Sequence, residues 1–400
     1  MSSLKHIYIY FALIVLTVMG GLVASCSSDE VGRDDQRPLH KLHLMTAQQH
    51  YGDLDIATTR STFEVSSGDD KATYETYEVP GSSLRVYITT KDRLDFYGDF
   101  LYTKEESSDN YSWTKEVPID NDNYYIYGFM AASLKDKASI GPNGNGYDKG
   151  AVLTINNVPS LMTEDFAVIV GLKRTNSKTG TIGTDAASTP ALGDYSYNAE
   201  GSDNYVYILL DHLYSRLRFK MNMSEEYSQV RKIYLKKMEL TPASVSKFNV
   251  TATLTAGRFY TLDADYIPFA GTGNKETLFL CEDDLYTDDG DGDKPGICLG
   301  TSFINFITTD TPAAFATNRS QYVHDVYIAP ANIKLSLECT YDIYDSKGNL
   351  IRENQTATNT FSLGTLNAGT SYTVNLTVAP TYLYVLSEPD LDNPTIKVGS

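Results

Sequence analysis

Tyr124-Tyr125-Ile126-Tyr127-Gly128-Phe129 alternates its side chains in the manner of a half-buried β-strand. Leu84-Arg85-Val86-Tyr87-Ile88, further upstream, has the same two-residue period. Two short apolar runs, Val152–Ile155 and Phe166–Val170, are typical of strands that are covered on both faces. Glycine, proline and asparagine gather at 141–146, where they indicate a turn. This part of the chain is therefore predicted to be a series of short strands.

The same pattern continues toward the end of the chain. Further strands are expected at 204–210, 212–221, 233–240, 248–254, 334–344, 349–356 and 371–378. No long amphipathic helix is indicated, and the best candidate, Ser224–Tyr234, soon becomes strand-like. Many short strands separated by turn signals favour β-sandwiches, and the length fits two of them in series. We expect domains over 61–211 and 212–380.

The composition is that of a folded, acidic protein. Of 400 residues, 42% are hydrophobic and 21% are charged. The formal net charge of -18 argues against binding to nucleic acid or to anionic membrane surfaces, because both need basic patches. Tyrosine outnumbers phenylalanine by 30 to 15, which suits strands at half-hydrated surfaces. Cys281, Cys298 and Cys339 allow either one disulfide, between the first two, or small buried thiols.

The first 25 residues have the pattern of an export signal. Basic Lys5 is followed by an uncharged apolar run, Ile7–Val23, and by small residues before Cys26. The string VASC resembles a bacterial lipobox, whose cysteine takes a diacylglycerol and becomes the first residue of the mature protein. Ser27–Glu30 is similar to the acidic tag that directs some lipoproteins to the outer surface. We therefore expect lipidation at Cys26 and a lipid anchor in the outer membrane; the alternative is a plain signal peptide.

The sequence contains no GxSxG elbow, HExxH helix or nucleotide-binding loop. The most ligand-like cluster lies in the string TDDGDGDKPG, where alternate carboxylates in a glycine-rich loop are able to bind calcium. Its members are Asp288, Asp289, Asp291 and Asp293. The EF-hand pattern fails because Lys294 and Gly300 stand in place of the required glycine and glutamate. We favour a solvated acidic loop, and we expect no cofactor and no enzymatic activity.

The order of these features resembles the fimbrillin family, the type V pilins of Gram-negative gut and oral bacteria. The lipobox Cys26 is followed by a short alternating strand, Leu39–Thr46, and then by Arg60 in the string IATTRS. The β-rich region comes next, with LRVYI, YYIYGFM, HLYSRLRFKM and SYTVNLTV in turn. The resemblance extends over nearly the whole chain. It implies an all-β fold of two tandem Greek-key, transthyretin-like β-sandwich domains.

In that family an arginine-specific protease cuts the exported lipoprotein and releases the first strand with its lipid. The resemblance therefore implies a lipidated propeptide over 26–60, cleavage after Arg60 and a mature N-terminus at Ser61. The vacated groove, open along a sheet edge, is filled by a strand of a neighbouring subunit. The donor is expected in the tail, 381–400, where the candidates are Tyr382, Tyr384, Leu386, Ile396 and Val398. These residues alternatively form a closing strand of the subunit's own second domain.

We expect one of two functions, the first of which is implied by the resemblance. The first is a structural subunit of cell-surface fimbriae, which has other fimbrial subunits as partners and supports adhesion. The tail looks short for a chain that both completes its own sheet and donates a strand, so tip, accessory and uncleaved anchor subunits are included beside stalk subunits. The second function is an anchored outer-membrane lipoprotein that binds glycans through tyrosine-rich faces without polymerising.

Overall fold

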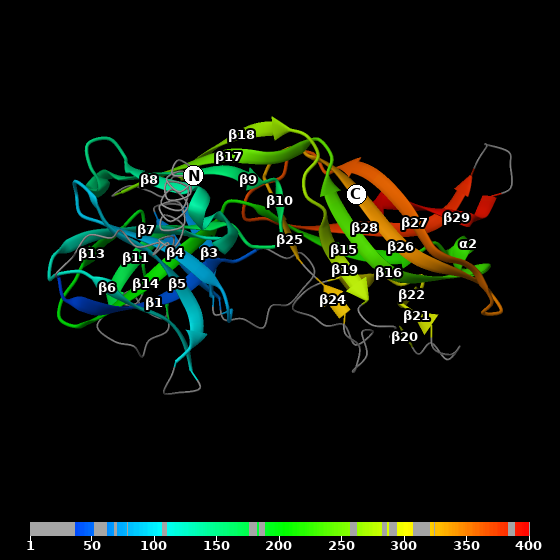
Figure 1. Cartoon of the computed structure of the whole chain (residues 1–400), viewed down its shortest axis with the longest axis horizontal. Helices are drawn as coiled ribbons and strands as arrows, with labels where there is room; N and C mark the ends of the chain where they lie inside the picture. Colours follow the sequence, from blue (N-terminus) through cyan, green and yellow to red (C-terminus); the bar gives the residue numbers. More distant parts are fainter. Residues whose placement is uncertain are drawn as a thin grey trace, which may run out of the picture.

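The computed structural model describes residues 37–51, 62–67, 70–77, 79–105, 110–175, 182–183, 189–256, 262–281, 286–287, 294–306, 321–323, 325–382 and 389–399. Most elements in these ranges are β-strands, which confirms the all-β prediction. The helical elements there are short: η1 (Ala132–Lys137), η2 (Tyr147–Lys149) and α2 (Glu225–Ser228). Within the same ranges, no helix has the length and apolarity needed to cross a bilayer. Figure 1 shows an elongated molecule in which an N-terminal half lies beside a C-terminal half.

The N-terminal half is built on one sheet of 11 strands. The strands are β1 (Leu39–Gln49), β2 (Thr62–Ser67), β3 (Asp70–Thr76), β4 (Ser83–Thr89), β5 (Leu94–Lys104), β6 (Tyr111–Pro118), β7 (Asn123–Met130), β11 (Ala167–Thr175), β12 (Ala191–Leu192), β13 (Ser196–Asn198) and β14 (Asp203–His212). The main path runs β12-β11-β14-β1-β6-β5-β4-β7-β13, and the hairpin of β2 and β3 lies beside β1. Because β11 also pairs with β7, the path closes on itself.

β7 contains the stretch that first indicates β structure in the sequence. It pairs with β4, and Tyr124 and Ile126 are buried in the core. Tyr127 and Phe129 on the opposite face are buried too, so the strand is covered on both faces beyond Tyr125 and not half-buried as the alternation predicts. Gly128 lies so close to β4 that an added Cβ atom would stand 2.3 Å from the carbonyl oxygen of Arg85. The glycine therefore permits a close approach of two backbones that a larger residue would prevent.

Two six-stranded sheets make up most of the C-terminal half. The first contains β10 (Leu161–Met162), β25 (Val326–Ile328), β15 (Ser215–Met223), β28 (Ser371–Tyr382) and β29 (Pro389–Gly399) in that order, with β23 (Ile304–Phe306) beside β15. The second contains β24 (Gln321–Val323), β19 (Glu276–Cys281), β16 (Arg231–Pro242), β26 (Lys334–Asp345) and β27 (Leu350–Ser362), with β22 (Ile297–Leu299) beside β16. A separate pair is formed by β20 (Tyr286–Thr287) and β21 (Lys294–Pro295).

A parallel pairing recurs in both halves, whereas the other pairings among the described residues are antiparallel. In the N-terminal half β1 runs parallel to β14, with Lys41 opposite Asp203. In the C-terminal half β15 runs parallel to β28, with Arg216 opposite Ser371. The first strand of each half therefore pairs with a strand that comes late in the same half.

A four-stranded sheet joins the halves across the boundary that the sequence places near residue 212. Its members are β8 (Ala138–Pro142), β9 (Gly150–Pro159), β17 (Val245–Thr255) and β18 (Leu262–Ala270). β17 of the C-terminal half pairs with β9 of the N-terminal half, and the four strands lie side by side in Figure 1. β10 pairs with β25 in the same way. The halves thus share backbone hydrogen bonds, and a division into two tandem Greek-key domains stays a prediction.

Tyrosine is used in the core as well as at half-hydrated surfaces. Tyr127 and Tyr214 are buried, and their hydroxyls donate to the backbone oxygens of Tyr147, at 2.5 Å, and Pro159, at 2.8 Å. These bonds offset the loss of water around the hydroxyl. Burial raises the pKa of Tyr87 to about 12, and burial also raises the pKa of Tyr127 above its ordinary value.

These pKa shifts predict that the fold loses stability at alkaline pH. A buried tyrosine with a raised folded pKa stabilises the fold below its unfolded pKa of about 10, and this contribution is lost as the pH rises through the folded value. Ultraviolet absorbance of tyrosinate should therefore rise in two steps. Exposed tyrosines titrate first, and the buried ones ionise only at about pH 12 or above, together with unfolding. A single step with the fold intact would contradict this.

Candidate functional site

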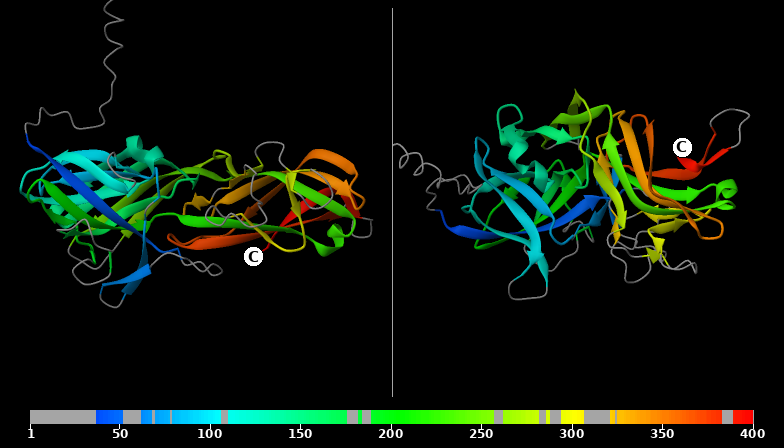
Figure 2. Two further views of the ribbon diagram at one scale, coloured as in Figure 1. Left: turned by 90° about the horizontal axis from the view of Figure 1, so that it is seen from below. Right: turned by 45° about the vertical axis from the view of Figure 1, so that its right-hand side comes forward.

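β1 is held on both sides by the large sheet. On one side it pairs with β14 over 41–48; on the other it pairs with β6 over 39–44 and with β3 over 47–49. Figure 2 shows the strand crossing the N-terminal half from its outer end to the middle of the molecule. Its 11 residues span about 36 Å. Removing β1 would open a slot of that length, with unpaired backbone groups on both walls.

The inner face of β1 is apolar at Leu42 and Leu44 and polar further along, at Thr46 and Gln48. Leu42 and Leu44 are buried in the core, and each such side chain contributes about 2–3 kcal/mol through its removal from water. Leu39, at the start of the strand, is 60% exposed. On the outer face the ring of His43 stacks on Tyr205, with 4.6 Å between the ring centroids. The strand is therefore seated by burial on one face and by neighbouring side chains on the other.

An ion pair fixes the start of β1. Arg37, two residues before the strand, pairs with Asp95 of β5, whose side chain is only 3% exposed. Arg93 Nη2 lies 3.0 Å from the second carboxylate oxygen of Asp95. Solvent screens a buried carboxylate less than an exposed one, so this pairing ties the entry to β1 firmly to the sheet.

A buried polar cluster holds the other end of β1, and we name it the junction cluster. It comprises Gln48, Tyr51, Asp165, His212 and Arg216. The Asp165 carboxylate accepts hydrogen bonds from Gln48 Nε2, at 2.6 Å, and from the Tyr51 hydroxyl, at 3.2 Å. His212 Nδ1 lies 3.0 Å from Asp165 Oδ2, and its Nε2 lies 2.7 Å from the backbone oxygen of Gln49. Both ring nitrogens of His212 thus face oxygen atoms inside the cluster.

The ring of Tyr51 contacts groups at the junction of the halves. It stacks on His212 with 3.7 Å between ring centroids, and the Arg216 guanidinium carbon lies 4.3 Å from the Tyr51 centroid. Burial, with the Asp165 carboxylate as the second cause, raises the pKa of the Tyr51 hydroxyl well above its ordinary value. The hydroxyl therefore remains a neutral donor to Asp165 at physiological pH.

The position of β1 corrects the expectation of a groove along a sheet edge. β1 is an internal strand, because β14 pairs with one of its edges and β6 and β3 pair with the other. The alternation in the sequence indicates one buried face but not how many edges are paired. The sequence also does not indicate Asp165 and His212 as site residues, because they are far along the chain from their partners: Asp165 lies 117 residues after Gln48, and His212 lies 163 residues after Gln49. The feature of the sequence that could have indicated these two residues is a charged or polar side chain directly next to an apolar run.

Several predicted site residues lie outside the described residues. They are Cys26, Arg60, Ser61, Tyr384, Leu386, Asp288, Asp289, Asp291 and Asp293. Arg60 belongs to the segment 52–61, which links β1 to β2 along the chain. Among the residues that the structure does describe, no group of three or more histidine, cysteine or acidic side chains is placed to hold a metal ion.

The described part of the tail pairs within its own chain. Tyr382 is the last residue of β28, and β29 follows as an antiparallel partner of β28 at the edge of the sheet. Ile396 of β29 stands opposite Val378 and is buried, and Val398 stands opposite Leu376 and is half-buried. The tail is thus arranged as a closing strand in this chain, and its role as a donor stays a prediction.

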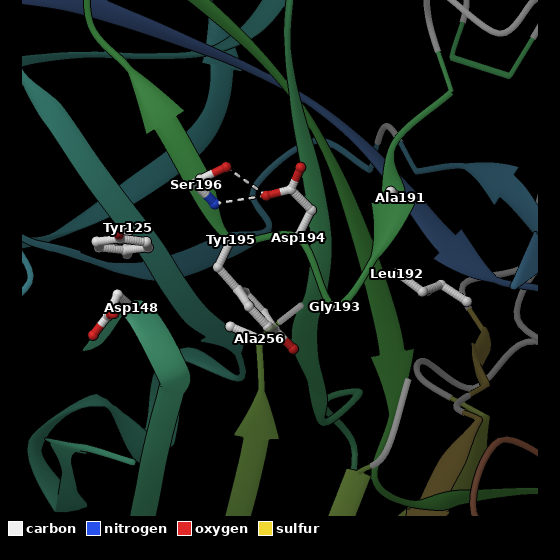
Figure 3. A pocket seen from close by; sticks show the side chains of 9 residues that line it. All are labelled: Tyr125, Asp148, Ala191, Leu192, Gly193, Asp194, Tyr195, Ser196 and Ala256. Carbon is white, nitrogen blue, oxygen red and sulfur yellow. Dashed lines mark hydrogen bonds between the residues drawn. The ribbon is translucent and has the colours of Figure 1, made fainter. Parts of the chain in front are cut away.

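A hollow of about 510 Å³ lies in the N-terminal half (Figure 3). Its lining comprises Tyr125, Asp148, Ala191, Leu192, Gly193, Asp194, Tyr195, Ser196 and Ala256. Figure 3 shows Tyr125 and Asp148 across from the segment 191–196. Asp194 Oδ1 accepts hydrogen bonds from the Ser196 amide, at 2.9 Å, and hydroxyl, at 2.6 Å. Aromatic rings beside carboxylates suit a polyhydroxylated ligand, which stacks on a ring and donates to oxygen.

No protein-family model matches the chain, and no curated protein matches it by sequence. Solved structures similar to it include a candidate cell adhesion protein from Bacteroides fragilis, at 10% identity and a TM-score of 0.39, covering 90% of this chain and 97% of that one. A fimbrial protein from Bacteroides vulgatus has 15% identity, a TM-score of 0.34 and coverages of 80% and 92%. A candidate polysaccharide-binding protein from Bacteroides thetaiotaomicron has 9% identity, a TM-score of 0.31 and coverages of 86% and 92%.

The seating of β1 predicts a contrast between two leucines of the same strand. Leu42→Ala should lower the free energy of unfolding by about 2–5 kcal/mol, because it leaves a cavity in the core. Leu39→Ala is the matched control and should change it by no more than about 0.5 kcal/mol, because Leu39 is 60% exposed. Urea denaturation followed by circular dichroism measures both. Equal effects would mean that β1 is not seated as described.

Proposed function

We propose that this chain is a structural, non-enzymatic subunit of cell-surface fimbriae that assembles by strand exchange. In this proposal the chain is exported as a lipoprotein anchored through Cys26, and an arginine-specific protease cuts after Arg60 so that Ser61 becomes the N-terminus. β1 then leaves its slot, and a strand of another fimbrial subunit takes its place. The resulting polymer supports adhesion at the cell surface.

One observation carries this proposal. β1 is buried and hydrogen-bonded on both edges, yet the segment 52–61 alone connects it to the strands that follow. A single cut after Arg60 would sever that connection and leave every described strand from β2 onward in one chain. The vacated slot would present apolar side chains and unpaired backbone groups, which another alternating strand is able to cover.

The names of the structural neighbours agree with a surface adhesion-related role, since they include fimbrial and candidate cell adhesion proteins. The proposal itself stands on the geometry of β1. We also propose that each half is a Greek-key unit of the transthyretin-like kind. The recurrence of a parallel pairing between first and late strands, β1 with β14 and β15 with β28, supports this.

Arg60→Ala should leave the subunit folded but block assembly, because β1 stays covalently attached and keeps its slot. Electron microscopy detects polymers, and N-terminal sequencing of surface material should give Ser61 for the wild type and Cys26 for the variant. Arg352→Ala, at an exposed arginine of β27, is the matched control. Normal polymers from Arg60→Ala would reject the mechanism, as would wild-type material that begins only at Cys26 although an arginine-specific protease is present.

The hollow in Figure 3 favours a second candidate function, an anchored surface lipoprotein that binds glycans without polymerising. Tyr125→Ala should then abolish retention of the protein on an immobilised polysaccharide, because it removes the ring on which a sugar would stack. Tyr111→Ala, at a tyrosine that is 43% exposed and outside the hollow, should bind like the wild type. If both variants bind equally well across a polysaccharide panel, the hollow is not a glycan site.

A further inference from the structure

The junction cluster connects the end of β1 to several separate elements of the molecule. Gln48 belongs to β1 and Tyr51 follows it, whereas Asp165 lies between β10 and β11. His212 is the last residue of β14, and Arg216 belongs to β15 of the C-terminal half. The side chain of His212 is fully buried, and that of Asp165 is 9% exposed. The cluster is thus a buried polar site rather than a set of contacts on the surface.

Departure of β1 would strip this site of its partners. Asp165 would lose an amide donor at 2.6 Å and a hydroxyl donor at 3.2 Å. His212 would lose both the backbone oxygen of Gln49 and the ring of Tyr51. A buried carboxylate or imidazole without partners is unfavourable, and hydrogen bonds to charged groups are stronger than neutral ones. A strand that fills the slot without forming these contacts to Asp165 and His212 would therefore bind less tightly than a strand that forms them.

We propose that Asp165, His212 and Arg216 form a recognition site that selects which strand occupies the slot. This inference rests on the proposed function and specifies the partner for it. The site accepts an alternating strand with an amide side chain at the place of Gln48 and an aromatic ring three positions later, as in Gln48-Gln49-His50-Tyr51. β29 contains one amide side chain, Asn393, but no aromatic residue. The matching strand is therefore supplied by a different subunit rather than by β29 of a second copy of this chain.

The test uses the full chain, nicked after Arg60 by an arginine-specific protease, and fluorescent synthetic peptides that compete with the bound leader. The first peptide has the sequence of residues 37–51, and the second carries Gln48→Ala and Tyr51→Ala. A third peptide carries Lys41→Ala, an exposed position on the same strand, and a fourth has the sequence of residues 389–399. Fluorescence anisotropy should show that the second and fourth peptides bind about tenfold or more weakly than the first and third.

The peptides leave the protein unchanged, so a folding defect cannot imitate the result. Equal binding of the first and second peptides would overturn the recognition site while leaving strand exchange intact. Asp165→Ala in the protein should reduce the difference between these two peptides, because Asp165 accepts from both Gln48 and Tyr51, and an unchanged difference would also overturn the inference.

Failure of the nick, or of every peptide to enter the slot, would contradict strand exchange itself. In that case the recognition site is tested in the uncut chain. There Gln48→Ala combined with Tyr51→Ala should speed hydrogen exchange of the β1 amides by about tenfold relative to Lys41→Ala. Equal exchange rates would overturn the site.

Discussion

The insertion of β1 between β14 and β6 is the constraint on which the N-terminal half depends. β14 and β6 are joined through β1 in the path of the sheet, and the pairing of β11 with β7 closes that path into a ring of strands. Without β1 the ring would be interrupted, and the core beneath Leu42 and Leu44 would face water. A segment in this position has to be present while the chain folds, or has to be replaced as it leaves.

The sequence predicts the strands well because the two-residue period is a property of the backbone itself. LRVYI and YYIYGFM lie in β4 and β7 as expected, and Gly128 stands where two strands approach closely. The choice of partners could not be predicted, because alternation shows which face is buried and not which strand lies alongside. The pairing of β17 with β9 and the internal position of β1 are both of this kind. The junction cluster could not be predicted either, because it combines three distant parts of the sequence, 48–51, 165 and 212–216, that meet only in the folded chain.

The two halves place their first strands in similar surroundings but attach them differently. β15 follows β14 after only Leu213 and Tyr214, so it has covalent continuity on both sides. β1 has strands only after it among the described residues, and the segment 52–61 connects it to them. The sheet of β8, β9, β17 and β18 contains no part of β1. These hydrogen bonds between the halves therefore do not involve β1.

The parallel direction of β1 and β14 has a consequence for how molecules of this kind would line up. β14 ends where the halves meet, so a strand that replaces β1 in the same direction enters at the outer end of the N-terminal half and finishes at the centre (Figure 2). The body of a molecule that offers its last strand would then lie beyond that outer end, in line with the long axis. If the inserted strand ran in the opposite direction, the body of the donor molecule would lie against the C-terminal half. A fibre assembled in this way would have two chemically distinct ends, one with an empty slot and one with an unused donor strand, because slot and donor are different surfaces of the molecule.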